Sequence, residues 1–182
     1  MTKHYQEKIK GQVWIADDKE KIRSFIMRSI DSYLLEVCHN CQKFDFELFS
    51  SGEDVREKLE RKFFNYIKEL NSLDEELKGN KIFRKERVEL TKYRGSLEKE
   101  SMDFNTLVIL DHEMSPGPTG LDLAKKYSKV VPIIIYNGDN EAVKREAIKH
   151  GVIAYFSKPC ELPRLCEEVA NTFGAVPLET VD

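Results

Sequence analysis

Short apolar segments alternate with amphipathic stretches along the chain. Continuous apolar runs, rich in β-branched and aromatic residues, occupy residues 13–16, 106–110, 132–136 and 154–156. Such runs predict strands that are buried on both faces, as in a parallel sheet. Residues 44–49 instead alternate apolar and polar positions, which is typical of an exposed or edge strand.

Between these strands, apolar residues recur at steps of three and four and predict helices. The helical segments cover residues 22–37, 120–127, 140–150 and 162–173. Strands that alternate with helices in this way predict a doubly wound α/β fold, with a parallel sheet covered on both faces. Because ligands of such sheets lie beyond the carboxyl ends of the strands, we expect the chemistry where the apolar runs end.

The segment between Phe49 and Asp111 departs from this simple alternation. It holds about 60 residues, far more than one crossover connection needs. Apolar residues at helical spacing run from Val55 to Leu77, stop at a Gly-Asn pair, and resume from Phe83 to Leu97. The pattern predicts a helical hairpin, at about residues 53–101, inserted between the second and third strands. A partner-binding role and packing of the hairpin on itself and on the domain both stay open.

Composition favours one soluble domain over residues 1–182. Of its 182 residues, 41% are hydrophobic, which is enough for a core. The net charge of −3 argues against a nucleic-acid partner, and no apolar run reaches the length of a transmembrane helix. The N-terminal residues are too polar for a secretory signal. We therefore expect a cytoplasmic protein without a membrane or nucleic-acid partner.

The four cysteines are then expected to be reduced thiols. Cys38 and Cys41 have the spacing of a metal-binding pair, but a zinc site needs about four ligands and no second pair lies near them in sequence. Cys160 and Cys166 follow the fifth strand. We interpret the first pair as a loop with incidental thiols.

Charged residues stand at the ends of three predicted strands. Asp17 and Asp18 follow the first strand, Asp111 the third and Lys158 the fifth. Carboxylates that lie close together need a divalent cation to stay ionised, and oxygen ligands suit Mg2+. A lysine opposite the cation would neutralise phosphoryl oxygens. Each residue alone is unspecific, since Asp18 would also serve as a helix cap, but the set suits phosphoryl transfer to a carboxylate.

The order and placement of these motifs resemble the receiver domain of bacterial two-component response regulators, the CheY-like superfamily. The resemblance covers about residues 11–50 and 104–174, with the hairpin outside it. It implies a flavodoxin-like (βα)5 fold with strand order 2-1-3-4-5. It also implies Asp111 as the phosphoacceptor and Lys158 as the conserved lysine, joined to Pro159 by a cis bond. The implied Mg2+ ligands are Asp17, Asp18, Asp111 and the backbone carbonyl of Glu113.

The resemblance also implies a function. A histidine kinase or phosphotransfer protein would phosphorylate Asp111, and output would pass to a downstream protein partner. The chain would be a signalling domain rather than an enzyme, with only its own phosphorylation and dephosphorylation as reactions. A homodimer is compatible with the sequence.

Several positions make this an atypical receiver. Asn137 stands where the family usually has Thr or Ser, and Tyr155 matches the switch aromatic that normally follows that hydroxyl. The alternative is therefore a pseudo-receiver, a protein-binding module that works without phosphorylation. Glu113 and Asp139 occupy positions that tune hydrolysis in this family, and two acidic residues there predict an unusual phosphoryl lifetime. The loop at residues 112–120 is one residue longer than usual.

A haloacid-dehalogenase-like phosphatase also uses a strand-end Asp with Mg2+. That family requires a second Asp two residues after its nucleophile, where Glu113 stands here. Its acidic pair also comes late in the chain, whereas Asp17 and Asp18 come early. The sequence therefore disfavours this enzyme.

Overall fold

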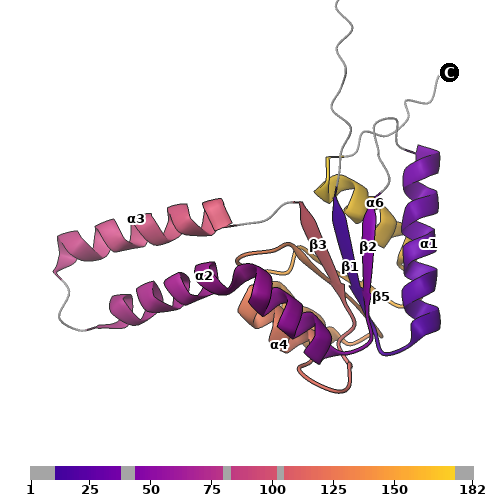
Figure 1. Ribbon diagram of the computed structural model, residues 1–182, viewed down its shortest axis with the longest axis horizontal. Coiled ribbons are helices and arrows are strands. Elements are labelled where there is room, and N and C mark those ends of the chain that lie inside the picture. The colour runs from indigo at the N-terminus through magenta and orange to yellow at the C-terminus, as the bar shows by residue number, and fades with distance from the viewer. Residues whose placement is uncertain (1–10, 38–43, 80–82, 102–104, 175–182) are drawn as a thin grey trace, which may run out of the picture.

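A five-stranded parallel sheet forms the centre of the protein (Figure 1). The computed structural model describes residues 11–37, 44–79, 83–101 and 105–174. All neighbouring strands pair in parallel, in the order β2-β1-β3-β4-β5. The strands are β1 (Gln12–Ala16), β2 (Asp45–Phe49), β3 (Thr106–Leu110), β4 (Ile133–Asn137) and β5 (Ala154–Ser157). The predicted fold class and strand order are confirmed, and β2 is the expected edge strand.

The helices follow the predicted order closely. They are α1 (Glu20–Val37), α2 (Gly52–Lys78), α3 (Arg84–Ser101), α4 (Gly120–Tyr127), α5 (Glu141–Lys149) and α6 (Leu162–Thr172). In the described residues, no helix is long and apolar enough to cross a membrane.

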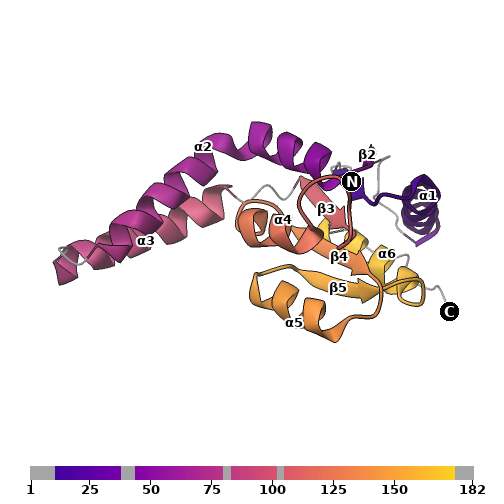
Figure 2. The ribbon, with the colours of Figure 1, turned by 90° about the horizontal axis from the view of Figure 1, so that it is seen from below.

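Alternating strand residues build one core on each face of the sheet. On β1, Val13 and Ile15 point to the face that α1 and α6 cover, whereas Trp14 and Ala16 point to the face that α2, α4 and α5 cover. Figures 1 and 2 show α1 and α6 on one side of the sheet and α2 and α4 on the other. Helices on both faces explain why the strands read as continuous apolar runs rather than alternating ones.

The helix α2 belongs both to the sheet and to the predicted hairpin. Its first half buries Val55, Leu59 and Phe63 in the core that contains Trp14. The ammonium groups of Lys58 and Lys62 lie 5.6 and 5.3 Å from the centre of the Trp14 ring. This half is therefore the crossover helix between β2 and β3.

The second half of α2 extends past the sheet and pairs with α3. Leu70 and Leu73 of α2 and Leu97 of α3 are buried in one apolar cluster, and Arg94 of α3 lies 2.5 Å from a carboxylate oxygen of Asp74. Figures 1 and 2 show this pair projecting away from the five strands. The hairpin predicted between strands 2 and 3 is present, and part of its apolar stripe is used for packing against itself.

The packing of α2 predicts where substitutions in it will destabilise the fold. Leu59→Ala removes a side chain with no exposure and is expected to lower the free energy of unfolding by about 2–5 kcal/mol. Phe64→Ala, five residues later on the exposed side, is expected to change it by about 0.5 kcal/mol or less. Urea denaturation followed by the fluorescence of the single tryptophan, Trp14, measures both. Equal effects from the two substitutions would contradict the packing described.

Candidate functional site

Three strand ends bring the predicted charged residues to one edge of the sheet. Ala16 of β1 pairs with Leu110 of β3, so Asp17 and Asp111 leave the sheet side by side. The backbone N–H of Asp111 donates to the carbonyl of Ala16 at 2.8 Å, which fixes this register at its last step. At the end of β5, the N–H of Lys158 donates to the carbonyl of Asn137 at 2.7 Å. The sheet therefore positions all three charged side chains beyond its carboxyl edge.

Lys158 lies between the two buried aspartates. Its ammonium is 2.5 Å from Oδ2 of Asp17 and 2.9 Å from Oδ1 of Asp111. Oδ1 of Asp111 also accepts a hydrogen bond from the backbone N–H of His112 at 2.9 Å. Oδ1 of Asp17 accepts from the N–H of Lys19 at 2.8 Å. Both carboxylates are thus held in fixed orientations by charge-assisted hydrogen bonds.

Asp18 completes an acidic cluster. One carboxylate oxygen from each of Asp17, Asp18 and Asp111 lies within 4.8 Å of the others. Asp17 and Asp111 are buried, whereas Asp18 is exposed. The three carboxylates outnumber the Lys158 ammonium, and the Arg23 guanidinium, which donates to the backbone carbonyl of Asp17, adds one further positive charge. A net negative charge remains, which a divalent cation is suited to balance. The donors are all hard oxygens, so the cluster fits Mg2+ better than a softer metal.

Burial dominates the electrostatics of Asp111. Loss of solvent raises the pKa of its carboxyl above the ordinary value. The neighbouring Lys158 ammonium and the His112 N–H act in the opposite direction, and the Asp17 carboxylate adds to the increase. Without a metal ion, ionised Asp111 therefore costs free energy in the folded protein.

The loop between β3 and α4 is fastened at three points. The N–H of Gly120 donates to the carbonyl of His112 at 3.0 Å, and the N–H of Glu53 on α2 donates to the carbonyl of Pro116 at 3.2 Å. A methyl group added at Gly52 would lie 1.9 Å from the Pro118 carbonyl oxygen, so only glycine permits this approach. The loop that follows Asp111 thus rests directly on the N-terminus of α2. No local pattern in the sequence predicts this contact, since it depends on residues that are far apart along the chain.

Two prolines at this edge follow cis peptide bonds. The Lys158–Pro159 bond is cis, which confirms the expectation drawn from the resemblance. The Ser115–Pro116 bond in the β3–α4 loop is also cis and was not predicted.

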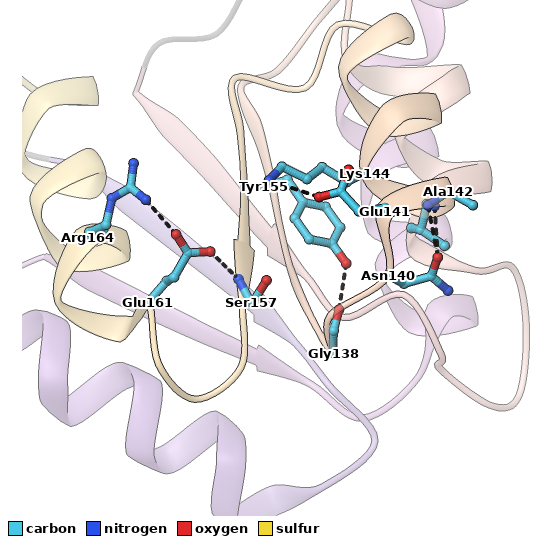
Figure 3. A network of polar contacts seen from close by, with 10 residues as sticks. Gly138, Asn140, Glu141, Ala142, Lys144, Tyr155, Ser157, Glu161 and Arg164 are labelled. Carbon is cyan, nitrogen blue, oxygen red and sulfur yellow. Dashed lines mark hydrogen bonds and ion pairs between the residues drawn. The ribbon is translucent and has the colours of Figure 1, made fainter.

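Glu161 supports the turn that carries Lys158, another contact that the sequence analysis missed. Its carboxylate accepts a hydrogen bond from the N–H of Ser157 at 2.8 Å and pairs with Arg164 at 2.5 Å (Figure 3). These contacts lower the pKa of Glu161, the bond from Ser157 most of all. The carboxylate thus bridges the end of β5 to the first turn of α6.

Asn137 and Tyr155 lie on neighbouring strands at the same edge. The Tyr155 hydroxyl donates to the carbonyl of Gly138 at 2.6 Å (Figure 3). Burial raises the pKa of this phenol most, and the nearby side chain of Asn137 acts in the opposite direction. The hydroxyl of the predicted switch aromatic is therefore bonded to the backbone that directly follows Asn137.

The remaining candidates lie apart from this cluster. Cys160 is exposed and Cys166 is buried, and burial raises the pKa of the Cys166 thiol to about 11. Cys38 and Cys41 lie outside the described residues. Glu113 is exposed in the β3–α4 loop, and the role of its carbonyl as a metal ligand stays a prediction.

The electrostatics of Asp111 predict that the metal-free protein is stabilised by removing its charge. A carboxyl with a raised pKa costs stability at every pH above its folded-state pKa, and the cost vanishes below the value of free aspartate, about 3.9. Asp111→Asn is therefore expected to raise the melting temperature by a few degrees at pH 7 in chelator, with a smaller difference at lower pH. Asp45→Asn, exposed at the far end of β2, is the control. A lower melting temperature for Asp111→Asn in chelator would contradict this reading.

Solved structures resemble most of the chain in fold, whereas no protein-family model and no curated protein matches it. A response regulator receiver protein from Burkholderia phymatum is 18% identical, with a TM-score of 0.54 over 92% of this chain and 98% of its own. The receiver domain of the Francisella response regulator 1452 is 18% identical, with a TM-score of 0.53 over 90% and 97%. The response regulator TrrA from Thermotoga maritima, solved in complex with Mg2+-BeF, is 19% identical, with a TM-score of 0.51 over 89% and 98%. The chain has the fold of response-regulator receiver domains, and its acidic cluster fits a phosphoacceptor site.

Proposed function

We propose that the protein is a receiver that accepts a phosphoryl group on Asp111 and passes the signal on by protein–protein contact. The observation that carries the proposal is the Lys158 ammonium placed between Asp17 and Asp111 at the carboxyl edge of the sheet. A half-buried lysine between two buried carboxylates has a structural role as well. However, a carboxylate oxygen of the exposed Asp18 lies within 4.8 Å of those of Asp17 and Asp111, and this further negative charge has no role in stabilising the fold.

The proposed reaction is an in-line transfer. A carboxylate oxygen of Asp111 attacks the phosphorus of a phosphohistidine on a histidine kinase or phosphotransfer protein. The P–N bond breaks, and the leaving imidazole takes a proton from solvent. Lys158, 2.9 Å from Oδ1 of Asp111, is placed to neutralise a phosphoryl oxygen, and the His112 N–H keeps the carboxylate oriented.

Asp17, Asp18 and Asp111 are the residues that would hold Mg2+, together with the Glu113 carbonyl expected from the resemblance. When bound, Mg2+ supplies charge neutralisation for the carboxylates and the phosphoryl group. Lys158 then no longer has to balance Asp17 and becomes available to the phosphoryl group. Dependence on Mg2+ follows from the excess negative charge of the cluster.

A pseudo-receiver remains the second candidate, because of Asn137. The amide of Asn137 is able to donate to a phosphoryl group, but it also carries a carbonyl oxygen that a phosphoryl group would repel. The Tyr155 hydroxyl is bonded to the Gly138 carbonyl and would have to leave that bond to move. If phosphorylation does not drive this movement, the fold serves as a binding module whose partner does not sense phosphorylation.

Phosphorylation is tested directly with a small phosphodonor. The full chain, incubated with Mg2+ and acetyl phosphate, is expected to gain the mass of one phosphoryl group, whereas Asp111→Asn is expected to gain none. Asp45→Asn controls for loss of an aspartate elsewhere, and circular dichroism checks that each variant folds. Absent labelling together with absent Mg2+ binding would favour the pseudo-receiver. Repeated turnover of p-nitrophenyl phosphate would favour a phosphatase.

The lifetime of the phosphoryl group depends on the two flanking acids. Glu113 and Asp139 are both exposed near the site, where their charges would repel an attacking hydroxide. At about 4 Å in water such repulsion is worth about 1 kcal/mol, or roughly a fivefold change in rate. Glu113→Asn and Asp139→Ala are each expected to shorten the half-time of dephosphorylation by that factor. Glu167→Gln on α6 is the control, and half-times equal to that of the wild type in both variants refute the hypothesis.

A further inference from the structure

A groove runs along the side of α2 that faces α4. Two adjoining hollows, of about 380 and 210 Å3, share Ile67, Asn71 and Lys126. We call this surface the α2–α4 groove and define it by Phe64, Ile67, Lys68, Asn71, Lys125 and Lys126. It lies away from Asp111 and has no part in the chemistry proposed above.

The floor of the α2–α4 groove carries two apolar side chains, of which Ile67 packs partly against the core and Phe64 is left largely exposed. Phe64, Ile67 and Asn71 recur at steps of three and four on α2, so they share one side of the helix. Phe64 is 61% exposed, whereas its neighbour Phe63 is 3% exposed and packs in the core. A single exposed aromatic is ordinary, but here it lines a hollow beside a second half-buried apolar side chain.

The rim of the groove carries more positive than negative charge. Its acids are already paired: Glu60 lies 2.8 Å from Lys126, and Asp74 contacts Arg94 and Lys129. These ion pairs lower the pKa of Glu60 and of Asp74, so both acids stay ionised. Lys68 and Lys125 add to the positive charge of the rim. A basic groove on a chain of net charge −3 selects for an acidic ligand.

We propose that the α2–α4 groove binds an acidic amphipathic helix of a partner protein. The apolar face of that helix would contact Phe64 and Ile67, and its carboxylates would pair with Lys68 and Lys125. From Glu60 to Asp74, α2 spans roughly 20 Å at about 1.5 Å per residue, the length of three to four helical turns. The groove is therefore long enough for such a helix.

Both walls of the groove are connected to the loop that follows Asp111. The N-terminus of α2 holds the Pro116 carbonyl through the N–H of Glu53. The first residue of α4, Gly120, sits against the Asp111 carbonyl oxygen, where an added methyl group would lie at 2.2 Å. Any dependence of helix binding on phosphorylation rests on the proposed function, but helix binding itself does not.

The test uses a fluorescent helical peptide of about 16 residues, with Leu at steps of three and four and Glu on the flanking positions. Fluorescence anisotropy with the full wild-type chain is expected to report binding that weakens with salt. Lys68→Glu with Lys125→Glu is expected to weaken it about tenfold, the value of two partly exposed ion pairs. A peptide with Lys in place of Glu is expected to prefer this double variant. If the wild type prefers the acidic peptide and the double variant prefers the basic one, Lys68 and Lys125 contact the charged residues of the peptide.

Phe64→Ala is expected to weaken peptide binding severalfold. Two control substitutions are expected to leave the affinity unchanged: Phe83→Ala, at an exposed position next to α3, and Lys92→Glu on α3. Peptide-induced NMR shifts are expected to centre on Ile67 and Lys125. Shifts elsewhere, or equal affinity for the acidic and basic peptides, overturn the proposal. So does tighter binding of an oligothymidylate of about 12 nucleotides, which indicates a nucleic-acid groove. Sedimentation showing a dimer that Lys68→Glu dissociates overturns it in favour of a second copy of the chain.

Repeating the titration after acetyl phosphate treatment separates the two proposals. If Asp111→Asn binds the peptide as tightly as the untreated wild type does, the groove is supported independently of phosphorylation at Asp111. A wild-type chain that acetyl phosphate does not phosphorylate but that still binds the peptide contradicts only the proposed function.

Discussion

The ion pairs of Lys158 with Asp17 and Asp111 are the constraint on which the site depends. Taking charges out of water costs several kcal/mol per ion, and removing the Lys158 ammonium would be strongly destabilising, because it would leave both buried carboxylates without their cation. The sheet meets this cost by bringing β1, β3 and β5 to a common edge, so that the lysine reaches both carboxylates. Small errors in register would leave a buried charge without a partner.

Several contacts around the site maintain that geometry. Glu161 holds the turn that carries Lys158, and the His112 N–H fixes the orientation of the Asp111 carboxylate. The close packing of Gly120 on the Asp111 carbonyl lets α4 begin immediately beside the site. These residues take no part in the proposed chemistry, but they fix where the carboxylate oxygens of Asp111 lie.

Local patterns predicted most of the fold and the charged cluster, because both depend on short segments of sequence. Buried parallel strands are recognised as apolar runs, and Asp17, Asp111 and Lys158 directly follow the ends of three of them. The two roles of α2 were not predictable in this way. Leu59 and Leu73 belong to one helical stripe and are both buried, although only the first half of α2 lies over the sheet (Figure 1). The contact of Gly52 with the β3–α4 loop likewise depends on residues far apart in sequence, which no local period reveals.

The same contact suggests how a change at Asp111 reaches the rest of the molecule. Asn137 holds the predicted switch position, and the hydroxyl of Tyr155 is bonded to the Gly138 carbonyl. Movement of that tyrosine would break a hydrogen bond worth about 1 kcal/mol, and Asn137 has no hydroxyl group that could take its place. The β3–α4 loop offers a shorter route, since it begins at the proposed acceptor and rests on Gly52. A displacement of this loop would act directly on α2, and through α2 on the projecting pair of helices.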